Sequence, residues 1–265
     1  MEVTRTKKTV AVLAWTLALL ALWEVTTRVQ QSIYMPPPTS IVQQLQQDWF
    51  AGPAQQLFFS DRWFDHGFIS IWRLLAGWGI ALLIGAPIGI LLGLRLKAKQ
   101  LLLPTMRFVG SVPPPALLPL ALILFGVGPF REISVIALGC IWPILLAAMA
   151  GVGSIEAVSS DAAKLLRLTK AGYLRKILLP AVMPALANGL RISLSFAVVL
   201  MVVSELFVAT SGLGYTLVEA QRTFRLLSMW AVVVLISLVG VLANALLEFI
   251  LRRVLKWHHA MAVRA

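Results

Sequence analysis

Few polar residues interrupt the apolar stretches of this 265-residue chain, and Glu205, which follows Ser204, is the one best placed to carry chemistry. A carboxylate inside a membrane costs roughly 2.5–3.5 kcal/mol on insertion scales, so it should face the interior of the helix bundle or water. We expect Ser204 and Glu205 to form a gate or a structural hydrogen-bond site. A proton relay is less favoured, because the sequence places no second buried acid or histidine beside Glu205.

A second irregular feature is the run Pro113-Pro114-Pro115, which follows Ser111 closely. Each proline lacks an N–H donor and clashes with a preceding helical turn. In lipid such a break survives only where protein or a water-filled cavity covers it. Transporters use broken helices of this kind along their pathways. Two alternatives stay open: Ser111 and the three prolines line a pathway or gate, or they form a plain kink.

Enzymatic chemistry is not indicated. No GxxxxGK[ST] run that could cradle a nucleotide is present in the sequence. His66 falls in a long polar loop, and the adjacent His258 and His259 lie near the C-terminus without further ligands. Cys140 is the single cysteine and is expected to be a small buried hydrophobe. We therefore predict no catalytic residue, metal or cofactor in this chain.

The composition places most of the chain in a membrane. Hydrophobic residues make up 59% of the sequence, charged residues make up 13%, and the mean hydropathy is +0.87. A helix needs about 20 apolar residues to cross roughly 30 Å of hydrocarbon. We predict an all-α polytopic membrane protein with about six transmembrane helices. The predicted spans are residues 10–25, 72–94, 101–126, 133–152, 190–208 and 226–251.

These spans predict a single transmembrane domain over residues 1–265. Its parts are an N-terminal helix and outer loop (1–71), core helices (72–257), a cytoplasmic loop (154–180) and a tail (258–265). The first span follows basic residues, as a signal peptide does, but it lacks a small-x-small cleavage pattern. We expect it to be retained as a signal-anchor helix.

The net charge of +12 is distributed as a topological signal. With both termini in the cytoplasm, most of the 23 Lys and Arg residues fall on the inner side, which is the positive-inside bias. This distribution argues against a nucleic-acid partner and for anionic lipid headgroups. The predicted inner basic residues are Arg5, Lys7, Lys8, Arg95, Lys97, Lys99, Arg107, Lys164, Arg167, Lys170, Arg175, Lys176, Arg252, Arg253, Lys256 and Arg264.

The cytoplasmic loop has the pattern of a short amphipathic helix. Apolar positions recur at spacings of three and four residues, which places them on one helix face. The stripe consists of Ile155, Val158, Ala162, Leu165 and Thr169. A second apolar face follows, and we expect Pro180 to end its helix. Such a helix could lie on the bilayer, but its short, braced form suits a groove on a partner protein.

Asp161-Ala162-Ala163, closed by Leu179-Pro180, resembles the EAA loop of bacterial ABC-importer permease subunits. Similarity to the nitrate, sulfonate, taurine and bicarbonate branch of that family runs from about Pro36 to Trp257. The further motifs are Ser70-Ile71-Trp72-Arg73-Leu74-Leu75-Ala76-Gly77, Ser111-Val112-Pro113-Pro114, Leu124-Phe125-Gly126-Val127-Gly128, Gly189-Leu190-Arg191, Ser204-Glu205-Leu206 and Ser211-Gly212-Leu213-Gly214-Tyr215.

Two positions depart from the family pattern. Asp161 stands where the family has Glu, and Arg167 stands where it has Gly. If that glycine supplies a left-handed helix end, an arginine there costs about 1 kcal/mol or forces another turn. Thr169 could still cap the second helix, and Gly172 could absorb the bend.

The resemblance implies a type I ABC-importer permease fold in the bacterial inner membrane, with a cytoplasmic coupling-helix loop. It implies a second permease copy, two ATPase subunits that bind ATP and Mg²⁺, and an external solute-binding protein. The implied solute is small and anionic or zwitterionic. The residues implied to couple to the ATPase are Ile155, Val158, Asp161, Ala162, Ala163, Leu165, Leu166, Arg167, Leu179 and Pro180. The alternatives are an ion-coupled secondary carrier, which would need inverted halves and buried ion ligands, and an integral-membrane enzyme.

Overall fold

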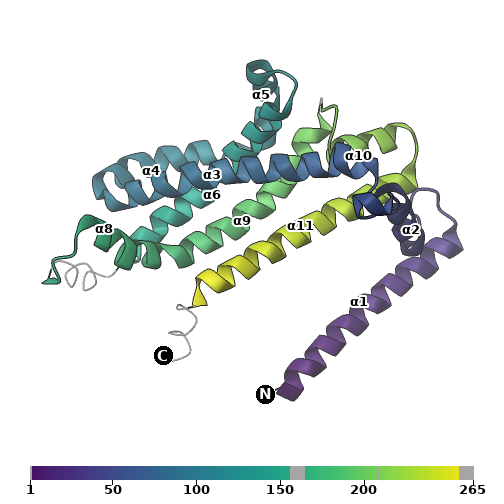
Figure 1. Ribbon diagram of the computed structural model, residues 1–265, viewed down its shortest axis with the longest axis horizontal. Helices are drawn as coiled ribbons and strands as arrows, with labels where there is room; N and C mark the ends of the chain where they lie inside the picture. The colour runs from purple at the N-terminus through teal and green to yellow at the C-terminus, as the bar shows by residue number, and fades with distance from the viewer. Residues whose placement is uncertain (1, 156–164, 208, 257–265) are drawn as a thin grey trace.

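The computed structural model describes residues 2–155, 165–207 and 209–256, and all regular elements in this part of the chain are helical. Figure 1 shows long helices that run side by side, with short helices at both ends. The elements are α1 (Glu2–Gln30), α2 (Pro38–Trp49), η1 (Ala54–Gln56), η2 (Trp63–Gly67), α3 (Phe68–Leu94), α4 (Leu96–Gly110), η3 (Pro114–Leu117), α5 (Leu118–Phe125), α6 (Pro129–Gly153), α8 (Lys170–Tyr173), η4 (Leu174–Leu178), α9 (Leu179–Leu206), α10 (Leu213–Arg222) and α11 (Leu226–Val254).

Five helical stretches of the described residues are long and apolar enough to cross a membrane, and a bent pair gives up to six. The prediction of an all-α membrane protein with about six spans is therefore confirmed. The long stretches are Ala11–Gln30, Trp63–Leu94, Pro129–Gly153, Lys170–Leu206 and Leu226–Val254. The bent pair is Leu96–Gly110 with Pro114–Phe125.

The span predicted at 101–126 is broken rather than straight. Helix α4 ends at Gly110, and the chain turns by 78° into η3 and α5. Pro113 adopts an extended conformation at the break, with φ −61° and ψ 118°. Three prolines in a row withhold three backbone donors, so a helix cannot pass through them. Figure 1 shows α5 standing away from the line of α4 as a result.

Helices α3, α6 and α9 form the packed centre of the molecule (Figure 1). The close approach of α3 to α6 depends on Gly85, Gly89 and Gly93, which lie on one face of α3. A Cβ atom at Gly89 would fall 2.3 Å from the carbonyl oxygen of Leu145 on α6. Small residues allow helices to pack backbone to backbone in lipid. This glycine face therefore packs within the chain.

The prediction that Pro180 ends a helix is wrong. The helical stretch is continuous from Lys170 to Leu206, through α8, the π turn η4 and α9. The Leu179 N–H donates to the carbonyl of Leu174, which is the wider spacing of a π turn. Pro180 lies directly after this π turn, inside the continuous helical stretch. The widened turn just before it gives the proline ring room.

The two ends of this long helix carry different elements. Figure 1 places α8 at one end of the molecule and α10, with α2, at the other. Helix α1 runs apart from the centre, and only 6% of its most apolar window is buried within the chain. Its exposed side chains include Val12, Leu13, Trp15 and Leu17. Such a surface suits lipid.

Candidate functional site

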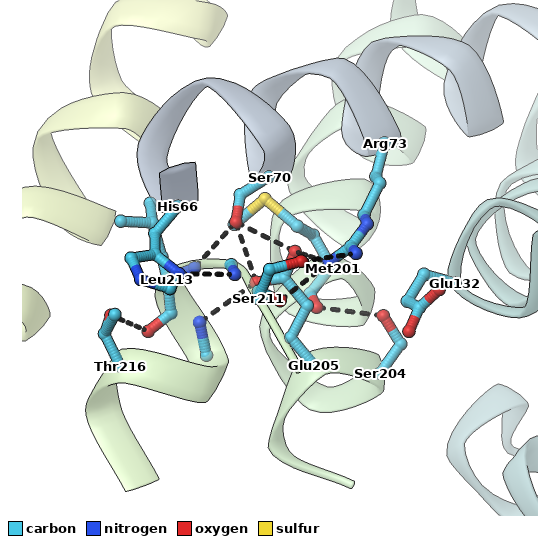
Figure 2. Close-up of polar contacts among 12 residues, drawn as sticks. His66, Ser70, Arg73, Glu132, Met201, Ser204, Glu205, Ser211, Leu213 and Thr216 are labelled. Atoms are coloured by element: carbon cyan, nitrogen blue, oxygen red, sulfur yellow. Dashed lines mark hydrogen bonds and ion pairs between the residues drawn. The ribbon is translucent and has the colours of Figure 1, made fainter. Parts of the chain in front are cut away.

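Glu205 anchors a buried polar cluster at the α10 end of the molecule (Figure 2). Its Oε1 accepts a hydrogen bond from Nη1 of Arg73 on α3, at 3.0 Å. The hydroxyl of Ser70, one turn earlier on α3, lies 2.8 Å from both carboxylate oxygens. Both carboxylate oxygens are therefore engaged by α3. The cluster ties α3 to the end of α9.

The loop between α9 and α10 closes over the same carboxylate. The Gly214 N–H donates to Oε2 of Glu205 at 3.0 Å, and the Leu213 N–H donates to the Ser70 hydroxyl at 2.7 Å. Arg73 also donates to the carbonyl and the hydroxyl of Ser211. Figure 2 shows these groups converging from α3, from the end of α9, and from the loop and first turn of α10. A buried carboxylate with this many partners is typical of a structural anchor.

Gly212 and Gly214 allow the backbone to come this close to Glu205. Gly212 has φ +116°, a conformation that side chains rarely adopt, and a Cβ there would fall 2.3 Å from the carboxyl carbon of Glu205. A Cβ at Gly214 would fall 2.7 Å from the Glu205 Cβ. The motif Ser211–Tyr215 thus has a physical reason: its glycines let the backbone close over Glu205.

His66 extends the cluster from the π turn η2. Its Nδ1 accepts a hydrogen bond from the Gly212 N–H at 3.2 Å, and its ring stacks on Tyr215 of α10 at 5.7 Å. The sequence placed His66 in a loop without partners. The structure instead uses it to hold the glycine loop.

A second buried ion pair joins Arg131 and Glu132 in the first turn of α6. Arg131 also donates to the carbonyl of Ser204 at 3.4 Å. The side chains of Arg73 on α3 and Arg131 on α6 are both buried. The expectation that Glu205 lacks a second buried acid is wrong, since Glu132 is buried too.

The prolines of the break and the end of α9 come together. Pro114 packs on Gly139 of α6, where an added Cβ would lie 3.0 Å from the proline ring. Pro115 and Phe207 line a cavity of about 240 Å³ with Arg131. The remaining lining residues are Leu118, Pro119 and Leu122. The cavity therefore lies where α5, α6 and α9 meet.

Ser111, Pro113 and Ser204 were also proposed for a pathway or gate, but they are not among the residues that line this cavity. Ser111 is exposed at the end of α4, and its hydroxyl donates to the Phe108 carbonyl. Pro113 is exposed as well. Ser204 is buried, and its hydroxyl donates to the Met201 carbonyl within α9. The side chains of Ser204 and Glu205 are thus engaged by internal hydrogen bonds, and the cavity is reached by Pro115 instead.

The residues assigned to coupling are partly described. Val158, Asp161, Ala162 and Ala163 lie outside the described residues. The described members differ in exposure: Ile155 packs against the core, whereas Leu165 and Leu166 are 85% and 72% exposed. Leu179 is exposed and Pro180 is half-buried within the continuous helix. The described part therefore presents two adjacent leucines at the α8 end.

The turn after Leu165 and Leu166 has the left-handed backbone that is expected where the family has glycine. Arg167 adopts a left-handed conformation, with φ +48°. Thr169 then caps α8, because its hydroxyl accepts a hydrogen bond from the Gly172 N–H at 3.1 Å. The expectation of a Thr169 cap is confirmed. Arginine here takes the conformation for which glycine is usual.

Over residues 2–155, 165–207 and 209–256, no group of three or more His, Cys, Asp or Glu side chains could hold a metal ion. The polar clusters of the described chain are ion pairs and hydrogen bonds between helices. Together with the candidate spans, they define a polytopic helical membrane protein.

Residues 85–256 match the family described as "Binding-protein-dependent transport system inner membrane component", so the chain belongs to this family. It is 32% identical over 242 residues to the taurine transport system permease protein TauC of Escherichia coli (strain K12), covering 91% of this chain and 86% of that protein. It is 28% identical over 244 residues to the putative aliphatic sulfonates transport permease protein SsuC of Bacillus subtilis (strain 168), covering 91% and 85%.

The nitrate import permease protein NrtB of Leptolyngbya laminosa is 29% identical over 245 residues, covering 89% of this chain and 84% of that protein. The fold is similar to that of a chain in an inward-facing structure of the MetNI methionine ABC transporter. The TM-score is 0.62 at 21% identity, with 71% of this chain and 93% of that chain covered. The chain is therefore an ABC-transporter permease component, a transporter subunit and not an enzyme.

Proposed function

We propose that this chain forms the translocation pathway of an ATP-driven importer for a small anionic or zwitterionic solute. The observation that carries the proposal is the similarity, over about nine-tenths of the chain, to permeases named for taurine and aliphatic sulfonates. The relative named for nitrate adds an inorganic anion to this group. The shared chemistry is a small solute with a negatively charged oxygen group.

Coupling to the motor occurs at the α8 end. Leu165 and Leu166 are exposed there in a chain segment where water would otherwise cover them. Two adjacent exposed apolar side chains suit a groove on a partner. The partner is an ATPase subunit, present in two copies, which binds ATP and Mg²⁺. Val158, Asp161, Ala162 and Ala163, which lie outside the described residues, are assigned to the same coupling loop by the family resemblance.

The orientation in the bacterial inner membrane follows from charge. Exposed basic residues gather at the α8 end, where Lys170, Arg175 and Lys176 lie, and at the end of α11, where Arg252 and Arg253 lie. The positive-inside bias makes this end cytoplasmic, together with both termini. The opposite end, with α2 and α10, faces the solute-binding protein. A second copy of the permease completes the pathway.

Reconstitution tests the proposal. The chain is co-expressed with candidate ATPase and binding-protein partners, purified and placed in vesicles. We expect taurine or nitrate uptake that needs ATP and the binding protein. Uptake driven by an ion gradient, without an associated ATPase, would support a secondary carrier instead.

A matched pair of variants tests the docking surface. Leu166→Asp should abolish co-purification of the ATPase, because a charge would enter an apolar groove. The control is Leu57→Asp, since Leu57 is 77% exposed but lies in the loop before α3, at the other end of the molecule. Equal ATPase recovery from both variants would contradict docking at Leu166.

A further inference from the structure

Among the described residues, Arg131 is the only charged residue in the lining of the cavity at the broken span. Its five companions, Pro115, Leu118, Pro119, Leu122 and Phe207, are apolar. The arginine is 1% exposed, so its charge is held inside the protein. A buried cation in apolar surroundings is costly unless partners satisfy it. The question is therefore whether its donors are occupied.

Some N–H donors of Arg131 have no hydrogen-bond partner among the described residues. Only its Nη2 has partners among the described residues, namely Glu132 and the Ser204 carbonyl. Its Nε is buried without a partner, and so is Oε2 of Glu132. A guanidinium has five N–H donors in a planar fork that matches an oxyanion. The Nε of Arg73 is also buried without a partner, but both Nη atoms of Arg73 are used in the cluster around Glu205, whereas Nη1 of Arg131 has no partner among the described residues.

The cavity lies at a place in the fold where a passing solute would meet the unpaired N–H donors of Arg131. Pro115 and Leu118 belong to the turn where the span breaks, and Phe207 follows the end of α9. Broken spans are where transporters place binding sites along the pathway. A volume of about 240 Å³ admits a small organic ion, since a water molecule occupies about 30 Å³ of liquid.

We propose that this cavity is an anion subsite of the translocation pathway, in which the guanidinium of Arg131 holds the charged oxygen group of the passing solute. The proposal rests on the proposed function, because it identifies the solute by its negative charge. Apolar walls would accept the short carbon chain of a sulfonate. The same walls strengthen the attraction between the guanidinium and the oxyanion by excluding water.

Glu132 is the competing partner in this site. When the cavity is empty, its carboxylate neutralises Arg131 within the first turn of α6. An arriving anion must share the guanidinium with that carboxylate, which keeps binding weak. A pathway needs such weak binding, because a solute must leave the site as readily as it enters. Arg131 thus attracts the solute and Glu132 limits its residence.

The test uses a thiol placed in the cavity wall of the full transporter complex. Leu122→Cys, in a Cys140→Ala background, is treated with two methanethiosulfonates of opposite charge, one with a sulfonate and one with a trimethylammonium group. The thiolate attacks the sulfenyl sulfur, forms a disulfide and releases methanesulfinate. We expect the anionic reagent to react about tenfold faster or more, because a cationic cavity concentrates anions. Taurine should slow its reaction.

The preference for the anionic reagent must depend on Arg131. It should disappear in Arg131→Gln and persist in Arg131→Lys. Because Arg131→Gln leaves Glu132 buried without a partner, the double variant Arg131→Gln/Glu132→Gln checks the result in a neutral site. A thiol at Leu57→Cys serves as the control, and its reagent preference should not respond to Arg131.

Two results would overturn the subsite: a reagent preference that survives Arg131→Gln and the double variant, or a thiol at residue 122 that neither reagent reaches. Both of these results are obtained without measuring ATP-driven uptake by the wild-type complex. Wild-type uptake with an unaltered reagent preference would refute the subsite alone. A wild-type complex that transports no anion would refute the proposed function.

Discussion

Arg73 of α3 and Glu205 of α9 form an ion pair of 3.0 Å whose side chains are almost completely buried. The pair joins two helices that are far apart in the sequence and lies directly under the loop that leads into α10. It is therefore the most consequential polar contact between helices in the described part of the chain.

Glu205→Gln should lower the stability of the folded protein by about 3–5 kcal/mol, because it leaves Arg73 buried without its countercharge. Thermal unfolding of the purified protein in detergent measures the change. The control is Glu248→Gln, since Glu248 pairs with Arg191 and Arg252 on the surface. Surface pairs contribute about 0–1 kcal/mol, so this variant should unfold near the wild-type temperature. Similar losses in both variants would contradict a structural role for the buried pair.

Gly212→Ala should be more harmful than its backbone conformation alone explains. Gly126→Ala is the matched control, because Gly126 also has a positive φ but has open space where a Cβ would be. Both glycines combine a positive φ with an extended ψ, a region that is essentially restricted to glycine, so alanine at Gly126 should cost about 1–3 kcal/mol. At Gly212 the new methyl group also meets the Glu205 carboxylate. If thermal unfolding shows an equal loss of stability in the two variants, the loop at Gly212 can move away from the Glu205 carboxylate.

Gly89→Ala should weaken the packing of α3 on α6. The methyl group would press against the Leu145 carbonyl, and overpacking of this kind costs about 1–3 kcal/mol. Gly79→Ala is the control on the same helix, because nothing lies within 4 Å of its Cβ position. Alanine there should be neutral or mildly stabilising. Detergent-solubilised protein would report both effects as shifts in the unfolding temperature, and a stabilised Gly89→Ala would refute the tight helix contact.

Arg167→Gly should make the turn before α8 easier to form. The left-handed conformation costs an arginine about 1 kcal/mol, which glycine avoids. Arg167→Ala is the comparison, since it removes the charge but keeps the strain. Hydrogen exchange of the amides in α8 should slow in the glycine variant only. Equal exchange in the two variants would mean that the arginine conformation carries no measurable strain.

The sequence supported the helical class, the approximate number of spans and the break at Pro113, because each depends on local composition. Hydropathy over about 20 residues reports lipid exposure, and three prolines prevent a helix whatever surrounds them. The left-handed requirement at Arg167 and the Thr169 cap were also readable, since both are properties of a single turn. These features need no knowledge of distant contacts.

The partners of Glu205 could not be predicted in the same way. Ser70 and Arg73 lie more than 130 residues earlier in the chain, and a basic residue at a span boundary looks like an interfacial anchor. The burial of Arg131 could not be predicted for the same reason. The continuation of the helix through Pro180 depends on a π turn, and the amino-acid composition of this segment does not indicate a π turn.

That π turn has a mechanical consequence. The uninterrupted helix from Lys170 to Leu206 spans 37 residues, or about 55 Å of rod. Its near end begins at the Thr169 cap, beside the exposed leucines, and its far end carries the carboxylate that holds the glycine loop shut. A displacement at the Lys170 end would thus reach the Glu205 cluster through the backbone of one continuous helical stretch.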